Sequence, residues 1–215
     1  MTEPVTFVSL TAATVSIPPT ADGSVPPGAR LVGASLLIAT RLGTRWRFSS
    51  EAATVAAGEK EQNLLLWLAD RLPMADTLIG WQIDQHLVPA LIDGAAHADP
   101  AIAHHFMVRL ARVLRNNVVD LSIDRSGVAD DVATAPSMMP DRLLAAWGTG
   151  RLDAVRDDLT AGALGTWLHF LRQAQHVGAD AESATRDWMH RRRNIHSVKS
   201  EPGNGLNGKG GKREP

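Results

Sequence analysis

Residues 64–91, LLLWLADRLPMADTLIGWQIDQHLVPAL, decide the fold class of this chain. They begin with a broad leucine stripe around Trp67 at helical spacing, which predicts a helix over residues 60–72. Pro73 cannot continue that helix, and the short apolar run TLIG at 77–80 is typical of a buried strand. A helix that leads directly into a buried strand indicates an α/β domain.

The N-terminal side of this stretch is rich in β-branched and apolar residues. It predicts strands over residues 5–10, 29–40 and 44–48, the last two joined by a turn at 41–43. Residues 17–28 contain four prolines and two glycines, which cannot hold regular structure for long and predict a surface loop.

The C-terminal side is mostly helical. Helical spacing and one further apolar run predict, in order, a helix at 86–92, a helix at 101–114, a strand at 118–121, and helices at 142–147, 152–159, 163–175 and 181–192. We therefore expect a mixed sheet flanked by helices over residues 1–196. Residues 197–215 are rich in glycine and lysine and nearly devoid of large apolar side chains, which predicts a disordered tail.

Composition narrows the classes of function. The 215 residues carry a formal net charge of −1, so attraction to nucleic acid would have to come from a local patch. The chain has no cysteine, which excludes disulfide frameworks, thiolate metal sites and cysteine nucleophiles. No apolar run reaches the roughly 18 residues of a membrane helix, and the first residues lack the basic cluster of a signal peptide. We expect a cytoplasmic protein without membrane association.

Isolated polar residues give little further indication of chemistry. No glycine-rich nucleotide-binding motif follows a predicted strand. The aspartates around Asp120 lack the spacing of a calcium loop, and we interpret them as a solvated acidic loop. Asp84 precedes a helical stretch and is interpreted as the N-cap of that helix.

The opening stretch also resembles the second motif of the DEDD-type 3′-5′ exonucleases, in the branch similar to the exonuclease domain of family B polymerases. That motif has the form G-x-N-x-x-x-F-D-L-P-x-L, and Gly80, the amide of Gln82, Pro89 and Leu91 match it. The metal-binding aspartate of the motif falls on Leu87. The resemblance implies a ribonuclease H-like fold.

Two further segments resemble motifs of the same superfamily. The N-terminal motif D-I-E-T aligns with SLTA, so that Ser9 and Thr11 replace both carboxylates. The stretch GALGTWLHFLR is similar to the helix of the third motif, whose aspartate becomes Gly162 and whose preceding tyrosine becomes Asp158. Residues 119–121 also resemble a short V-D-L strand of this branch.

The substitutions bear on activity, because this superfamily uses two divalent ions held by four carboxylates to hydrolyse phosphodiesters. Magnesium and manganese need hard, preferably anionic oxygen ligands. Hydroxyls at the first motif and the side chains of Leu87 and Gly162 do not meet that need. The resemblance therefore implies a non-catalytic domain without a cofactor, acting as a nucleic-acid-binding or assembly module.

Two other hypotheses stay open. Asp84 and Asp158 each lie about one helical turn from a lost ligand, so they are candidates for displaced ligands in a weakly active, Mg- or Mn-dependent 3′-5′ exonuclease. Alternatively, the chain is a globular protein unrelated to nucleic acids whose element order matches by chance; a structure without a central strand that brings Ser9 near Leu87 and Gly162 would favour this.

Predicted partners are single-stranded DNA or RNA, or another protein. For nucleic acid, the predicted contacts are Trp81 and Gln82 beside the lost site, together with the basic run Arg191, Arg192 and Arg193. This basic run continues into the lysines of the predicted tail, and keeping the tail soluble is an equally good explanation for it.

Overall fold

Three N-terminal strands form an antiparallel meander. β1 (Val5–Ile17) pairs with β2 (Gly28–Leu42), which pairs in turn with β3 (Arg45–Thr54). Gly43 has a φ of 61° in the tight turn between β2 and β3, a left-handed conformation that glycine adopts at little cost. The predicted strands are confirmed, and each is longer than its apolar core.

Two short parallel strands complete the sheet. β4 (Thr77–Gly80) pairs in parallel with β1, and β5 (Asn117–Asp120) pairs in parallel with β4. The resulting order is β3-β2-β1-β4-β5, with β1 at the centre. This confirms the predicted mixed sheet of an α/β fold.

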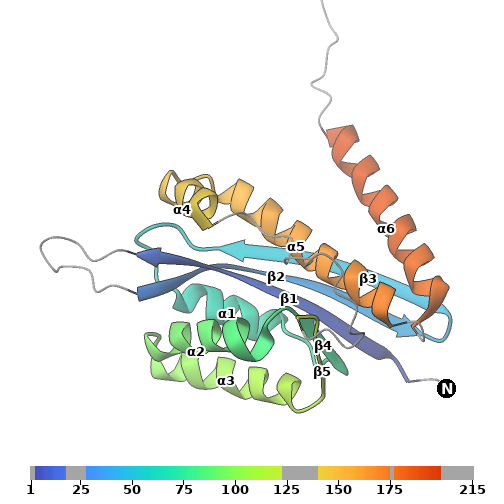
Figure 1. Ribbon diagram of the computed structural model, residues 1–215, viewed down its shortest axis with the longest axis horizontal. Coiled ribbons are helices and arrows are strands. Elements are labelled where there is room, and N and C mark those ends of the chain that lie inside the picture. Colours follow the sequence, from blue (N-terminus) through green and yellow to red (C-terminus); the bar gives the residue numbers. More distant parts are fainter. Residues whose placement is uncertain (1–2, 18–27, 123–139, 175–176, 200–215) are drawn as a thin grey trace, which may run out of the picture.

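The computed structural model describes residues 3–17, 28–122, 140–174 and 177–199. Within them, helices cover both faces of the sheet (Figure 1). The predicted loop at 17–28 and the predicted tail fall largely outside the described residues, although the last helix extends to Lys199, past the domain boundary predicted at 196.

One face of the sheet carries α1 (Gln62–Arg71), α2 (Val88–Ala96) and α3 (Pro100–Leu114). α3 begins sharply because the Asp99 side chain accepts from the Ala101 amide at 2.9 Å and Pro100 occupies its first turn. The core beneath these helices includes Val8, Leu10, Leu36, Leu65, Leu68, Leu78, Phe106 and Leu110.

The other face carries α4 (Pro140–Gly148) and α5 (Leu152–Gln173), with α6 (Gly178–Lys199) leaning away from the sheet beyond them (Figure 1). α5 packs so closely on β2 that a Cβ at Gly33 would lie 2.6 Å from Leu159 Cδ1. Trp167 is fully buried at the centre of an aromatic cluster with Phe7, Trp46, Phe48 and Phe170.

α5 corrects one prediction. Two helices were predicted, at 152–159 and 163–175, but the structure has a single helix through both. Glycine at position 162 costs a helix interior about 1 kcal/mol relative to alanine. Burial of the Val155, Leu159, Ala163, Trp167 face against the sheet outweighs that cost.

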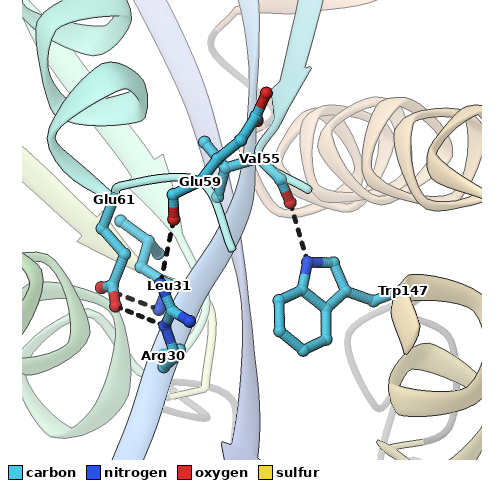
Figure 2. Close-up of polar contacts among 6 residues, drawn as sticks. All are labelled: Arg30, Leu31, Val55, Glu59, Glu61 and Trp147. Carbon is cyan, nitrogen blue, oxygen red and sulfur yellow. Dashed lines mark hydrogen bonds and ion pairs between the residues drawn. The ribbon is translucent and has the colours of Figure 1, made fainter. Parts of the chain in front are cut away.

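Polar contacts at one end of the meander tie both helical layers to it (Figure 2). The Glu61 carboxylate, at the start of α1, accepts from Arg30 Nε at 3.0 Å and from the Leu31 amide at 3.1 Å. On the other layer, Trp147 Nε1 of α4 donates to the Val55 carbonyl at 2.7 Å. Through the described parts of the chain, no helix is both long enough and apolar enough to cross a membrane.

Candidate functional site

A pocket opens where β1 continues past the end of β4. The two strands pair in parallel only from Phe7–Thr77 to Ser9–Ile79, so that β1 runs on beyond Gly80 without this neighbour. Ligand sites of open α/β sheets lie outside the carboxyl ends of parallel strands. The pocket has a volume of about 280 Å³ and is lined by Leu10, Thr11, Ala12, Ala13, Thr14, Trp81, Gln82, His86, Leu87, Ala90, Pro140, Leu143, Asp158, Leu159 and Gly162.

The pocket brings together positions that are far apart in the sequence and that were predicted as one site. Thr11, Leu87 and Gly162, one position from each of the three resembling motifs, all line it. Asp158 lines it as well, whereas Asp84 is exposed and does not. Of the two candidate displaced ligands, the structure therefore places one at the pocket.

Ser9 and Thr11 have a structural role that the sequence alone did not reveal. Both side chains face α5, and both hydroxyls donate to its backbone: Ser9 Oγ to the Ala163 carbonyl at 2.8 Å and Thr11 Oγ1 to the Leu159 carbonyl at 3.2 Å. Ser9 is fully buried. An ionised carboxylate only accepts hydrogen bonds, so at Ser9 it would confront a carbonyl oxygen. The hydroxyls fasten β1 to α5 instead.

The rim of the pocket is built by an unusual backbone. Gln82, directly after β4 and Trp81, has φ 47° and ψ 48°, and is the one non-glycine residue with positive φ among the residues described. A π-helical turn, η1 (Ile83–Leu87), follows and leads into α2. Left-handed non-glycine residues and π-helical turns are both costly, and they concentrate at functional sites.

Asp120, at the end of β5, holds this rim in place. Its carboxylate accepts from the backbone amides of Gln82 at 3.0 Å and Ile83 at 2.7 Å. It also accepts from the hydroxyl and the amide of Ser122, at 2.6 and 2.9 Å. Asp120 therefore has a structural role that our interpretation of a solvated acidic loop did not include, and the other aspartates of that cluster lie outside the described residues.

The surroundings of Asp120 alter its acidity. Burial raises the pKa of this carboxyl, but the hydrogen bonds from the Ser122 hydroxyl and from the amides of Ser122, Ile83 and Gln82 together outweigh burial. The net effect is a pKa below the ordinary value of an aspartate. The rim is therefore held by an ionised carboxylate at neutral pH.

Trp81 combines exposure to the pocket with an unsatisfied donor. Its indole packs at a tilt on His169 of α5, with ring centroids 5.0 Å apart. Its Nε1 is buried and has no hydrogen-bond partner among the described residues. Trp147 and Trp167, by contrast, satisfy theirs with the Val55 carbonyl and the Thr185 hydroxyl.

The remaining sequence predictions have mixed outcomes. Asp84 is not an N-cap: it lies inside the first turn of η1, which begins after Gln82. Arg191 and Arg192 lie on α6, in agreement with the helix predicted at 181–192, and Arg192 stacks on Trp188 with its Cζ 5.5 Å from the ring centroid. The backbone of Arg193 also belongs to α6, and its side chain lies outside the description.

These basic residues are not part of the pocket. Arg192 lines a separate hollow with Ser50 and Trp188, on the β3 side of α5. The nucleic-acid contacts predicted from the sequence are thus divided between the pocket rim and α6.

Donors for a metal ion are sparse. Among the described residues, no three His, Asp or Glu side chains are grouped to hold an ion. At the pocket itself, the side chains with metal-binding chemistry are Asp158 and His86, with the amide of Gln82. This donor set carries at most one negative charge, which is poorly matched to two divalent ions.

Sequence reasoning missed Asp120, His86 and His169. The signal available for Asp120 was its place at the end of a predicted strand, where side chains reach the carboxyl edge of a sheet. No comparable signal existed for the histidines. Comparison with known proteins finds no family model, no curated protein and no solved structure that matches this chain.

Proposed function

We propose that this chain is an exonuclease-like domain of the ribonuclease H type that has lost two-metal catalysis and binds single-stranded nucleic acid. The observation that carries this is the pocket at the end of β4, where Thr11, Leu87 and Gly162 meet. Each comes from a different one of the three segments that resemble exonuclease motifs. Chance likeness of three unconnected segments gives no reason for them to converge on one pocket.

The central place of β1 argues the same way. Ser9 lies on the middle strand of the sheet, and Thr11, two residues further along the same strand, lines the pocket. If the chain were an unrelated globular protein, there would be no reason to expect a central strand beside Leu87 and Gly162.

We infer the loss of catalysis from the side chains that stand where metal ligands would be needed. Ser9 and Thr11 direct their hydroxyl hydrogens at α5 carbonyls, and a neutral hydroxyl brings no negative charge to offset that of a cation. Leu87 and Gly162 have no side-chain donor to offer a cation. Two divalent ions would bring four positive charges to a pocket whose described lining has one carboxylate, that of Asp158.

Binding of a fluorescent single-stranded oligonucleotide at several salt concentrations tests the proposal. We expect binding that weakens with salt, that is unchanged by EDTA, and that leaves the oligonucleotide intact after prolonged incubation with Mg²⁺ or Mn²⁺. Absence of binding at low salt would reject a nucleic-acid role and leave assembly with a protein.

A weak exonuclease is the second candidate, because Asp158 lies at the pocket. It predicts metal-dependent shortening of a labelled strand from its 3′ end. Asp158→Ala should abolish the shortening, while Asp84→Ala, at an exposed position off the pocket lining, should not.

A further inference from the structure

The chemistry of the pocket lining indicates which part of a nucleic acid it accepts. No lysine or arginine is among the described residues that line the pocket, and Asp158 contributes a carboxylate. Phosphate sites commonly use lysine or arginine side chains to offset the charge of the ligand. Among the described residues, the lining therefore offers a phosphate no guanidinium or ammonium group.

The same lining suits an uncharged, flat, partly polar group. Leu10, Leu87 and Leu143 provide apolar contact, and Trp81 provides an aromatic side chain. The Gln82 amide both donates and accepts hydrogen bonds, as the edge of a nucleobase requires. The volume of about 280 Å³ fits a group smaller than a drug-sized ligand.

We infer that the pocket takes an unpaired nucleobase and not a phosphate, and that Asp120 is the positioning residue that holds Trp81 and Gln82 for it. This inference rests on the proposed nucleic-acid function. It adds the chemical group that the pocket recognises. It also adds a residue outside the pocket lining, Asp120, on which this recognition depends.

The positioning role follows from the geometry of the rim. Gln82 and Ile83 present consecutive backbone amides to one carboxylate, which fixes the chain direction at the left-handed residue. Trp81 directly precedes this turn, so its direction relative to the pocket depends on the same two hydrogen bonds. Without the carboxylate, the left-handed glutamine keeps its backbone strain and the rim loses the two hydrogen bonds that offset it.

The indole N–H of Trp81 supplies a direct measurement. The six tryptophans give six indole N–H signals in a ¹H–¹⁵N spectrum, and Trp81→Phe identifies the one from the pocket. Titration with cytidine and deoxyadenosine should shift that signal saturably, because a base in the pocket changes its surroundings. Inorganic phosphate at the same concentrations should leave it unmoved.

Substitution of Asp120 tests the positioning role. Asp120→Ala should weaken nucleoside affinity about tenfold, while Asp120→Asn, which keeps one acceptor oxygen, should recover part of it. Thr185→Ala is the matched control, because it removes a buried hydrogen-bond partner outside the pocket lining. It should lower stability without altering nucleoside affinity.

The outcomes separate this inference from the proposed function. If the oligonucleotide binds while nucleosides leave Trp81 unmoved, or if phosphate moves Trp81 and nucleosides do not, base recognition is overturned and the proposed function stands. If neither oligonucleotide nor nucleoside binds, both fail. If Asp120→Ala binds nucleosides as tightly as the unmodified protein, the positioning role is rejected.

Discussion

At the scale of single residues, the direction of the hydrogen bonds of Ser9 and Thr11 distinguishes a structural contact from a metal site. Ser9 and Thr11 occupy positions where the resembling family has carboxylates, yet both act as donors to α5. Because an ionised carboxylate cannot donate, introducing one at either position would break a contact between β1 and α5.

Ser9→Asp should therefore be strongly destabilising. We expect a loss of about 3–5 kcal/mol in unfolding free energy at neutral pH, because the charge would be fully buried against a carbonyl oxygen. The loss should shrink in acid, where the carboxyl is protonated and can donate. Ser9→Ala only removes one hydrogen bond and should lower the unfolding free energy by about 1 kcal/mol. Urea titrations of both variants measure the two losses. An aspartate variant as stable as the alanine variant would contradict this account.

Asp120 should make stability depend on pH. Its folded pKa is lowered, so its stabilising contribution is complete above the unfolded pKa of about 3.9 and disappears as the pH falls through the folded value. Asp120→Asn should lose about 1 kcal/mol at pH 6. The gap between the two proteins should close below about pH 4. Urea titrations at pH 6, 4 and 3 measure this difference in unfolding free energy. A difference that stays constant with pH would show that the ionised form of Asp120 has no special role.

At the scale of elements, the link from β4 to α2 combines a left-handed residue with a π-helical turn. Such a link is less stable than a regular one. The surrounding contacts, from Asp120 above all, maintain it at the edge of the pocket.

Gln82→Gly should relieve this strain. Glycine adopts the left-handed conformation freely, although its greater freedom in the unfolded chain removes part of the gain, so we expect unfolding free energy to rise by up to about 1 kcal/mol. Gln82→Ala keeps the strain and is the control. Both remove the amide and should weaken nucleoside binding equally; a stabilised alanine variant would argue against backbone strain.

A buried hydrogen bond from Trp167 Nε1 to Thr185 Oγ1, at 2.9 Å, joins α5 to α6, beside apolar contacts of Ala181 and Trp188. Thr185→Ala leaves the indole N–H buried without a partner, which should cost about 1–3 kcal/mol. Thr185→Ser keeps the hydroxyl and should cost less. Hydrogen exchange of the α6 amides should accelerate in the alanine variant, and unchanged exchange would mean that other contacts hold the helix.

At the scale of the whole molecule, the pocket and the basic part of α6 are separate surfaces. The pocket lies where β1 passes β4, while Arg191 and Arg192 lie on a helix that leans away beyond β3 (Figure 1). A bound strand would therefore have its base and its phosphates recognised at different places.

Substitution of one exposed arginine tests whether the base and the phosphates are recognised at separate places. Arg191→Gln should weaken oligonucleotide binding and lower its salt slope by about one, since one phosphate contact is lost, while leaving nucleoside binding unchanged. Arg112→Gln, at an exposed position on α3 across the sheet, is the control. Equal slopes for the two variants would remove α6 from the nucleic-acid surface.

The sequence by itself determined the elements and the layers they form. Strand β4 was predicted residue for residue from its short apolar run, which ends at Gly80, and α3 was predicted within one residue from its helical spacing. These signals are local, each residue being judged against neighbours a few positions away.

Only the tertiary structure decided what the site residues do. Ser9 meets its acceptor 154 residues away, and Asp120 meets Gln82 across 38 residues. The left-handed conformation of Gln82, the π-helical turn and the continuity of α5 all depend on such distant partners, which outweigh local preference. Periodicity shows which face of an element is buried, but a hydrogen bond needs a particular atom opposite it, and the folded chain alone brings that atom there.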